Sequence, residues 1–310
     1  MCKVVIEEES LLGKKIASLF NQKENIVTIK SFADTESFIK FDNIGFFKNK
    51  NIFLIKQFVF NKNSLINDQF FKLLLSVYFL KKAGAKKIVG VLPYLSYSRH
   101  DKGINKNNDG AIYLIGKLLQ TAGVSDLVCL ELHAPNIKEN FAINLHEITL
   151  QNFWSEHIKK ISSSFGNMDF CIVSPDRGGR ERVKKIAKIL NKDFFVLEKK
   201  RIAPDQPIVY NLDGNFKNKI AIIVDDILDT GKTAMQCCDV LLKNGAKKVV
   251  GCFTHAVFAY GTLEKIENSR FEKVFVTDTV VSKPKFLNSE KILVLSISNL
   301  LYKYLEDRFI

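Results

Sequence analysis

Residues 220–233 read Ile-Ala-Ile-Ile-Val-Asp-Asp-Ile-Leu-Asp-Thr-Gly-Lys-Thr, and this stretch decides the fold. The apolar run Ile220–Val224 predicts a buried strand, because short runs rich in β-branched residues fit a sheet that is covered on both faces. Two carboxylates follow the run, and a Thr-Gly turn then opens a helical pattern. In open α/β sheets, ligands bind outside the carboxyl ends of the strands. We therefore expect a strand–loop–helix unit with a ligand site at its turn.

The residues of this turn fit a sugar that carries a phosphate at its far end. Backbone N–H groups and the positive end of the helix dipole favour a phosphate there, and Thr230 and Thr233 add hydroxyl donors. Asp225 and Asp226 offer acceptors for two neighbouring sugar hydroxyls, directly or through a metal ion. A strand followed by an acidic helix cap would explain one aspartate, but not this pair together with Asp229.

The same turn ends in Gly231-Lys232-Thr233, which resembles the end of a Walker A loop. That motif requires a glycine five positions before the last one, and here the position is Asp226. We therefore do not expect a P-loop at this turn.

Short apolar runs alternate with helical patterns along the whole chain, which favours an α/β fold with parallel strands. The helical patterns include Leu73-Val77-Leu80 and Ala234-Val240-Leu241. The expected strands, besides residues 220–224, are Ile26–Ile29, Ile52–Ile55, Ile88–Leu92, Leu127–Leu130, Phe170–Ser174, Phe194–Leu197, Val249–Thr254 and Val274–Thr277.

An internal repeat divides the chain into halves. The sequence GAKKIVGV at residues 84–91 returns as GAKKVVGC at residues 245–252, and each copy follows a helical run and opens a strand. A glycine that ends a helix before a strand is common by chance, but the length and context of the match favour a true repeat. We expect two related α/β halves joined near residues 143–150, with a last helix at about 296–308 that could pack on either.

The composition is that of an ordinary globular protein, with 46% hydrophobic and 25% charged residues in 310. We see no transmembrane stretch, no signal peptide and no Cys-x-x-Cys among the six cysteines, so we expect a reduced, cytoplasmic enzyme with no membrane partner.

The net charge of +13 comes from 39 lysines and 7 arginines. The lysines are scattered and are not interleaved with aromatic residues, so we expect no nucleic-acid partner. Five arginines fall in three segments that carry other signals, and arginine is suited to phosphate binding: Arg99, Arg177, Arg180, Arg182 and Arg201.

Residues 220–233 resemble the ribose-phosphate loop of the type I phosphoribosyltransferase fold, and further segments resemble the ribose-phosphate pyrophosphokinase family in family order. Residues 32–36 (Phe-Ala-Asp-Thr-Glu) resemble its adenine loop, and residues 93–102 resemble its ATP loop. Residues 132–134 (Leu-His-Ala) and 173–179 (Val-Ser-Pro-Asp-Arg-Gly-Gly) resemble the family's Leu-His-Ala and pyrophosphate loop. The other matching segments are residues 198–201, which resemble the start of a mobile catalytic loop, and the landmarks at 254–257 and 276–279.

The resemblance implies two similar type I domains, residues 1–146 and 147–310, each a mainly parallel sheet flanked by helices. It also implies a reaction in which the β,γ-diphosphoryl group of ATP passes to O1 of ribose 5-phosphate, giving 5-phosphoribosyl 1-diphosphate (PRPP) and AMP. Mg²⁺ is the implied cofactor, with His133 and Asp176 binding the Mg-ATP. The implied catalytic residues are Lys199 and Arg201, cations that would close over the reactants and neutralise charge.

The resemblance assigns the remaining residues to substrates. The ribose 5-phosphate would be bound by Asp225, Asp226, Asp229, Thr230, Gly231, Lys232 and Thr233, and the diphosphate by Asp176, Arg177, Gly178 and Gly179, where the glycines would let the backbone approach closely. The ATP would be bound by Phe32, Asp34, Glu36, Arg99, His100, Asp101 and Lys102. The adenine loop would reach a neighbouring subunit, so we expect a homo-oligomer, a dimer or larger.

The sequence departs from the family at several points. His100 stands where the family usually has Gln, and Lys232 replaces a small residue, as in purine phosphoribosyltransferases. Glu131 replaces an aspartate, and residues 136–141 differ from the family pattern. Residues 103–112 lack the arginines of the family's phosphate and ADP regulatory site, so we predict weak or absent regulation by both.

Three other functions stay open on the sequence. A phosphoribosyltransferase that consumes PRPP would explain residues 225–233, but not the repeat, the Arg99 loop or Lys199 and Arg201. A catalytically silent regulatory homologue would bind ATP without turnover, and a basic nucleic-acid binder would show steep salt dependence.

Overall fold

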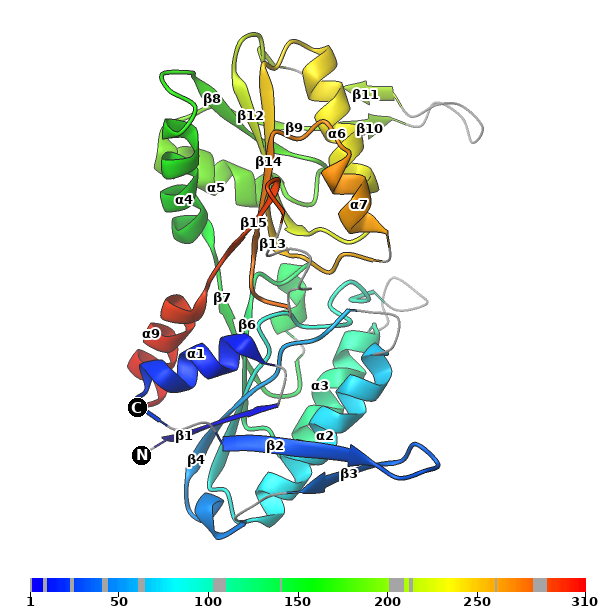
Figure 1. The fold of residues 1–310 in the computed structure, drawn as a ribbon, viewed down its shortest axis with the longest axis vertical. Helices are drawn as coiled ribbons and strands as arrows, with labels where there is room; N and C mark the ends of the chain where they lie inside the picture. The colour runs from blue at the N-terminus through cyan, green and yellow to red at the C-terminus, as the bar shows by residue number, and fades with distance from the viewer. Residues whose placement is uncertain are drawn as a thin grey trace. The chain divides into compact units, whose positions relative to one another are not determined.

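The computed structural model describes residues 2–7, 10–22, 25–40, 44–60, 65–102, 110–139, 141–200, 209–211, 214–259, 261–280 and 289–310. The chain divides into two compact units (Figure 1). Unit 1 contains residues 1–148, 278–281 and 296–310, and unit 2 contains residues 149–277 and 282–295. The last segment of the chain therefore returns to the unit that the first segment forms.

Unit 1 is built on a seven-stranded sheet in the order β3-β2-β1-β4-β5-β6-β7, parallel except for the β2–β3 pair. Helices α2 and α3 cover one face, and α1 and α9 cover the other (Figure 1). Its strands are β1 (Cys2–Glu7), β2 (Asn25–Ser31), β3 (Ser37–Lys40), β4 (Asn51–Ile55), β5 (Lys87–Val91), β6 (Asp126–Leu130) and β7 (Asn144–Ile148). Its helices are α1 (Leu11–Leu19), α2 (Ile66–Lys82), α3 (Ala111–Ala122) and α9 (Ser298–Phe309), with short turns η1 (Ile44–Phe47) and η2 (Pro135–Lys138).

Unit 2 is built on a six-stranded parallel sheet in the order β15-β14-β13-β12-β8-β9, with a separate β10–β11 hairpin. Its strands are β8 (Phe170–Ser174), β9 (Phe194–Val196), β10 (Glu198–Lys200), β11 (Val209–Asn211), β12 (Ile220–Ile227), β13 (Lys248–His255), β14 (Lys273–Thr277) and β15 (Ile292–Leu295). Helices α4 (Gln151–Ser163) and α5 (Arg180–Leu190) pack together on one face, and α6 (Lys232–Lys243) and α7 (Thr262–Glu267) lie on the other (Figure 1). The predicted α/β fold with two mainly parallel sheets is confirmed.

The sequence repeat corresponds to the same corner built twice. Gly84 and Gly245 end helices α2 and α6 with positive φ values of 85° and 94°, which explains why both are glycine. Their carbonyls accept from the N–H groups of Asn49 (2.9 Å) and Asn218 (3.1 Å), and both asparagines have positive φ. Each corner therefore joins a helix to the start of the preceding strand, β4 or β12, in the same way.

The strands that the sequence analysis missed lie mostly at the sheet edges. β3 and β7 are short and only partly buried, so their sequences carry weak apolar patterns. The edge strand β15 and the central strand β1 were missed although both contain apolar runs. Residues 144–148 form β7, which pairs with β6, and unit 2 begins at residue 149, inside the range 143–150 in which a joint was expected. The helix predicted from Ala234, Val240 and Leu241 is α6, but Cys237 and Cys238 belong to its buried face, whereas Val240 is only half-buried.

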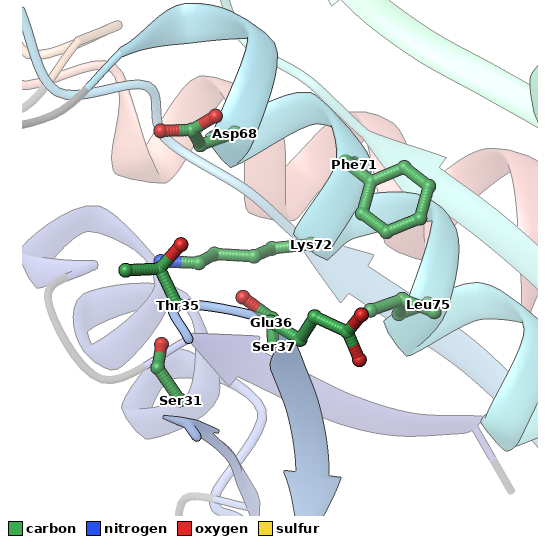
Figure 2. A pocket seen from close by; sticks show the side chains of 8 residues that line it. All are labelled: Ser31, Thr35, Glu36, Ser37, Asp68, Phe71, Lys72 and Leu75. Carbon is green, nitrogen blue, oxygen red and sulfur yellow. The ribbon is translucent and has the colours of Figure 1, made fainter. Parts of the chain in front are cut away.

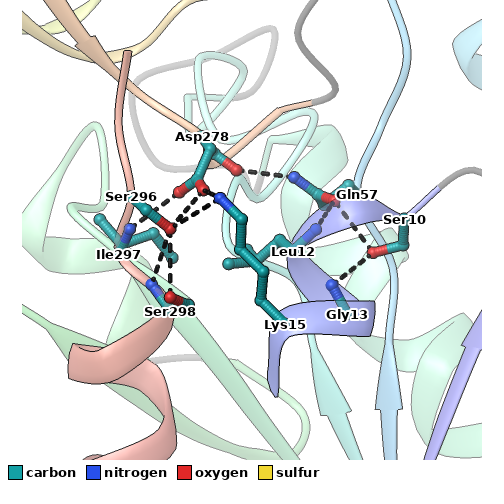
Figure 3. Close-up of polar contacts among 9 residues, drawn as sticks. All are labelled: Ser10, Leu12, Gly13, Lys15, Gln57, Asp278, Ser296, Ile297 and Ser298. Atoms are coloured by element: carbon teal, nitrogen blue, oxygen red, sulfur yellow. Dashed lines mark hydrogen bonds and ion pairs between the residues drawn. The ribbon is translucent and has the colours of Figure 1, made fainter. Parts of the chain in front are cut away.

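A polar cluster joins the last part of the chain to the first within unit 1 (Figure 3). The Asp278 carboxylate accepts from Lys15 Nζ (3.2 Å), Ser296 Oγ (2.6 Å) and the Ile297 N–H (2.8 Å). The Asp278 carbonyl accepts from Gln57 Nε2 at 2.6 Å. The last helix, α9, packs on α1, next to this cluster.

The described residues contain no helix that is both long and apolar enough to cross a membrane. All six cysteines are buried and free. Burial raises the pKa of Cys171 and Cys238 to about 12, which keeps these thiols neutral at physiological pH. The cysteines therefore belong to the core.

Candidate active site

Two of the predicted ligand loops of unit 2 lie next to each other. The pyrophosphate loop follows β8 and the ribose-phosphate loop follows β12, and these two strands are parallel neighbours. Parallel neighbours bring their carboxyl ends to the same edge of a sheet. The sheet thus places Asp176 and Asp225 at one edge of unit 2.

Asp225 and Asp226 lie inside strand β12, whereas the sequence analysis placed them after the end of the strand. The strand continues to Ile227, beyond the predicted end at Val224, because Ile227 still pairs with His255 of β13. The pair is largely buried, with side-chain exposures of 18% for Asp225 and 8% for Asp226. Pairing with β13 therefore holds both carboxylates on regular backbone.

Arg182 faces both carboxylates. Its Nη1 lies 3.1 Å from Asp225 Oδ1, and its Nη2 lies 3.5 Å from Asp226 Oδ1. Burial raises the pKa of Asp225 well above its usual value, and the Asp226 charge raises it further, whereas Arg182 opposes the shift. The cation thus offsets part of the repulsion that two adjacent, buried carboxylates produce.

The ribose-phosphate loop turns through Gly231 into helix α6. Gly231 has φ +71° and is the N-cap of that helix, a conformation that side chains rarely adopt. The backbone N–H of Lys232 lies 3.5 Å from Thr230 Oγ1, so the hydroxyl and the first amides of α6 share one turn. The carbonyl of Asp229 accepts from the Ala259 N–H at 3.1 Å, which ties the loop to the segment after β13. Thr233 lies half-buried in the first turn of α6.

The glycines of the pyrophosphate loop also make contacts within the protein. Asp176 Oδ1 accepts from the N–H groups of Gly178 (2.9 Å) and Gly179 (3.4 Å), so the loop closes on its own carboxylate. A Cβ at Gly179 would lie 2.4 Å from Ser174 Oγ and 3.3 Å from Arg182 Nη1. Gly179 is therefore required for packing beneath the loop, whereas the sequence analysis explained both glycines by approach to a diphosphate.

The stem of the predicted catalytic loop is held against the pyrophosphate loop. Arg177 binds Glu198 through two hydrogen bonds, Nε to Oε1 (3.0 Å) and Nη2 to Oε2 (2.8 Å). Glu198 begins β10, in which the backbone of Lys199 pairs with Tyr210 of β11. Arg201 lies outside the described residues, as do the details of the Lys199 side chain.

In unit 1, the predicted ATP loop follows β5. Residues 92–96 and Ser98 are buried, whereas Arg99 and His100 are exposed, so a packed segment presents these two side chains to solvent. A Cβ at Gly110 would lie 2.1 Å from the His100 carbonyl oxygen, so the start of α3 packs directly beneath the loop. Asp101 is half-buried and Lys102 is exposed.

His133 follows β6, the neighbour of β5, and is exposed at the same edge of the sheet. The Leu132 N–H donates to Glu147 Oε1 at 2.9 Å, and the Leu130 N–H donates to the Pro93 carbonyl at 3.1 Å. These bonds tie the His133 turn to β7 and to the ATP loop. Unit 1 thus brings Arg99, His100 and His133 to one edge.

The predicted adenine loop lies elsewhere in unit 1. It joins β2 to β3, and strands β1 and β4 separate β2 from β5, so the two loops start about 14 Å apart at ordinary strand spacing. Phe32 is 56% exposed and packs on Phe38 with ring centroids 4.6 Å apart. The Glu36 N–H donates to Asp34 Oδ1 at 3.1 Å, which fixes the loop. The structure therefore does not bring this loop together with the ATP loop of the same chain.

A pocket of about 610 Å³ lies between the adenine loop and α2 (Figure 2). The Lys72 side chain extends from α2 toward Thr35 across it, and the Phe71 ring lies beside it (Figure 2). Its lining residues are Ser31, Thr35, Glu36, Ser37, Asp68, Phe71, Lys72 and Leu75. Glu36, a predicted ATP ligand, thus lies at the edge of a cavity.

Two residues of the site were missed as ligand-loop components. Arg182 was noted only among the arginine-rich segments, and Glu198 only as part of a family motif. The signal for Arg182 was the scarcity of arginine, 7 residues against 39 lysines. Its partner carboxylates lie 43 and 44 positions away, which no local pattern indicates.

Comparisons with known proteins identify the family. Two family models match, the N-terminal domain of ribose phosphate pyrophosphokinase over residues 2–123 and the phosphoribosyl synthetase-associated domain over residues 184–307. The ribose-phosphate pyrophosphokinase of Fusobacterium nucleatum is 31% identical over 93% of this chain and 88% of its own length. This chain belongs to the ribose-phosphate pyrophosphokinase family. The enzyme of that name from Bacillus cereus is 34% identical over 76% of this chain and 73% of its own.

The fold agrees with a solved structure. Phosphoribosylpyrophosphate synthetase from Mycobacterium smegmatis superposes with a TM-score of 0.88, covering 99% of this chain and 98% of that one, at 24% identity. The likeness shows that the two chains share an architecture over their whole length. The family predicted from the motifs is thus confirmed by the relatives, and the fold by the superposition.

Proposed function

We propose that this chain transfers the β,γ-diphosphoryl group of ATP to O1 of ribose 5-phosphate and releases PRPP and AMP. The observation that carries the proposal is the pair of neighbouring loops at the ends of β8 and β12, with the stem of a cationic loop bound to the β8 loop through Arg177 and Glu198. Family membership points to the same reaction.

In the proposal, the ribose-phosphate loop binds the acceptor sugar. Asp225 and Asp226 accept hydrogen bonds from its neighbouring hydroxyls, and the turn through Gly231 presents the α6 amides, Thr230 and Thr233 to the 5-phosphate. Asp229 and Lys232 belong to the same loop. Binding both ends of the sugar orients O1 for attack, which supplies much of the rate enhancement in a two-substrate reaction.

The transfer step forms a bond between O1 and the β-phosphorus, breaks the bond from that phosphorus to the oxygen that leaves with AMP, and releases the O1 proton to solvent. Negative charge builds up on the transferred oxygens, so fixed cations lower the barrier. We assign this role to Lys199 and Arg201, and the hydrogen bonds between Arg177 and Glu198 anchor the start of their loop. Gly178 and Gly179 remain assigned to the diphosphate loop.

Mg²⁺ is the proposed cofactor. Asp176 fits as a ligand, because its Oδ1 already accepts two loop N–H groups, which would orient the carboxylate toward a cation. Among the described residues, no group of three or more His, Cys, Asp or Glu side chains could hold a metal ion. A site with few protein ligands is typical of Mg²⁺, which keeps waters and substrate phosphates in its coordination shell. When bound, the ion would neutralise phosphate charge. His133 would contact the ion through a water molecule.

The proposal assigns the adenine to two groups of residues. Arg99, His100, Asp101 and Lys102 would bind ATP from their own chain, and Phe32, Asp34 and Glu36 would bind the adenine of a neighbouring subunit. The separation of these loops on the sheet and the exposure of Phe32 support an oligomer, a dimer or larger. Sedimentation of the purified chain tests this, and a monomer at assay concentrations would contradict it.

Two further parts of the proposal follow from the family resemblance. We keep residues 1–146 and 147–310 as the two type I domains, which is supported by the matching order of five strands, β1-β4-β5-β6-β7 and β8-β12-β13-β14-β15. We keep the cytoplasm as the location, which fits the substrates.

A product assay tests the function. The chain is incubated with Mg²⁺, ATP and ribose 5-phosphate, and the nucleotide and sugar products are identified. We expect AMP and PRPP in equal amounts, and Lys199→Ala and Arg201→Ala should lose turnover while keeping ATP binding. ADP as the product would contradict the proposal, and ATP binding without turnover would favour a silent homologue.

A further inference from the structure

Arg182 differs from the other arginines near the site in the direction that it faces. Its side chain is 12% exposed and is directed at the Asp225–Asp226 pair, whereas the Arg177 side chain is 76% exposed. It belongs to the first turn of α5, and the Val183 N–H donates to the Gly179 carbonyl at 3.1 Å in the same turn. The guanidinium is therefore carried by the helix that starts at the pyrophosphate loop.

The two carboxylates that Arg182 contacts would repel each other without a cation. Asp225 and Asp226 are adjacent in the chain, and both are largely buried. Like charges in such a setting repel each other, and one of them would turn away or bind a proton. A guanidinium is planar and permanently charged, so its two Nη groups can hold two oxygens in one fixed geometry.

The surrounding backbone leaves room for this arrangement. A side chain at Gly179 would lie 3.3 Å from Arg182 Nη1, so the absence of one keeps the guanidinium in place. Asp225 Oδ1 also accepts from the Asp226 N–H at 3.0 Å. The Asp225 carboxylate is therefore held from two sides.

We infer that Arg182 is a positioning residue that holds Asp225 and Asp226 in the orientation that accepts the 2- and 3-hydroxyls of ribose. The inference rests on the proposed function for the identity of the sugar. Arg182 acts through the carboxylates, so it sets the preference for a sugar with both hydroxyls.

The test compares ribose 5-phosphate with 2-deoxyribose 5-phosphate in three variants. Arg182→Gln removes the cation, and Arg182→Lys keeps the charge but not the planar fork. Lys184→Gln is the matched control, because Lys184 is an exposed residue of the same helix and loses the same charge. The kcat/KM value is measured for each sugar phosphate, and calorimetry gives the dissociation constants of both.

We expect Arg182→Gln to raise the KM and the dissociation constant of ribose 5-phosphate roughly ten- to a hundredfold, the loss that a small misplacement at a site produces. The values for 2-deoxyribose 5-phosphate should change less, so the ratio between the two sugars falls. The KM of ATP should stay within about twofold of the parent value, because the expected loss concerns the binding of the sugar phosphate and not the binding of both substrates. Arg182→Lys should recover part of the ratio, and Lys184→Gln should match the parent chain.

Two results would overturn the inference. An equal loss for both sugars would mean that Arg182 contacts the phosphate or supports the fold only. An unchanged ratio at unchanged affinity would mean that the carboxylates need no cation. Because the dissociation constants do not depend on turnover, a chain that makes no AMP would refute the proposed function and would still test the role of Arg182.

Discussion

Gly179→Ala is expected to destabilise the chain, although its backbone would accept alanine. Gly179 has φ −83° and ψ 0°, which is ordinary for alanine. Removing a glycine at such a position normally stabilises a protein by about 0.4–1 kcal/mol, because the unfolded chain loses freedom. Here the added Cβ would lie 2.4 Å from Ser174 Oγ, well inside the 3.4 Å at which ordinary contact begins. Ser174 is fully buried, so the hydroxyl cannot move into solvent.

The size of the effect follows from this contact. Overpacking a filled interior typically costs about 1–3 kcal/mol, which exceeds the gain from the unfolded state and reverses its sign. Ser174→Ala removes the clashing oxygen at the loss of its 2.7 Å bond to the Asp176 carbonyl, which costs about 0.5–1.5 kcal/mol. The double variant Ser174→Ala/Gly179→Ala should therefore be more stable than the sum of the single effects by about 1–2 kcal/mol, within the range seen for contacting residues.

Urea unfolding of the four chains measures this coupling. Gly178→Ala is the contrast, because a Cβ there meets only Asp176 Oδ1 at 3.2 Å, and its effect on unfolding should be small. If Gly179→Ala were as stable as the parent chain, or if the double variant equalled the sum of the single ones, the packing argument would be refuted.

Three other changes test separate parts of the structure. Gln57→Ala should lower the unfolding free energy by about 2–5 kcal/mol in calorimetry, because it leaves buried partners unpaired, including the Asp278 carbonyl. Asp126→Asn should lower the unfolding free energy by about 1.5–3 kcal/mol at pH 7 in the same measurement. Burial raises the pKa of Asp126, but hydrogen bonds from Lys87 and His146 outweigh it and hold the pKa below 3.8. The difference should therefore shrink as the pH falls below that value and vanish only below the lowered pKa. Free phosphate should activate turnover weakly or not at all, because residues 103–112 lack arginine, and saturable activation in a phosphate titration would contradict this.

Matched controls separate these effects from general ones. Gln120→Ala removes an exposed glutamine whose Nε2 donates to the Ala142 carbonyl at 2.8 Å, so its cost should be below about 1 kcal/mol. Asp307→Asn removes an exposed carboxylate of α9, and its effect on stability should be within about 0.5 kcal/mol. Losses as large in these controls would show that the contacts around Gln57 and Asp126 do not explain the results.

The fold could be predicted because its signals are local. Buried parallel strands such as β8 and β12 are continuous apolar runs, and the glycines of the repeat mark where helices end. The loops after β5, β6 and β8 also follow strands as the motifs predict, whereas Asp225 and Asp226 lie inside β12. Edge strands such as β3 and β7 carry no such run, because one or both faces are exposed.

The contacts that shape the site are not local, and the sequence could not indicate them. Arg182 and Asp225 are 43 positions apart, and Arg177 and Glu198 are 21 apart. The packing role of Gly179 depends on the position of Ser174, which only the fold defines. A motif thus identifies the residues of a loop, whereas their roles depend on partners from other elements.

The two units show how one scaffold can hold different chemistry. The first strands of the two units along the chain are β1 and β8. Strand β4 pairs with β1 in unit 1, and β12 holds the corresponding place beside β8 in unit 2. At its carboxyl end, β12 presents Asp225 and Asp226, whereas β4 is followed by Lys56 and Gln57, and Gln57 is buried. Gln57 Oε1 accepts from Ser10 Oγ (2.9 Å) and the Leu12 N–H (3.0 Å), so it fills the crevice where unit 2 has its acidic pair. In unit 1, the predicted ligand residues lie instead after β2, β5 and β6. The repeat therefore conserves backbone geometry, and the residues after each strand decide whether its crevice is packed or open to a ligand.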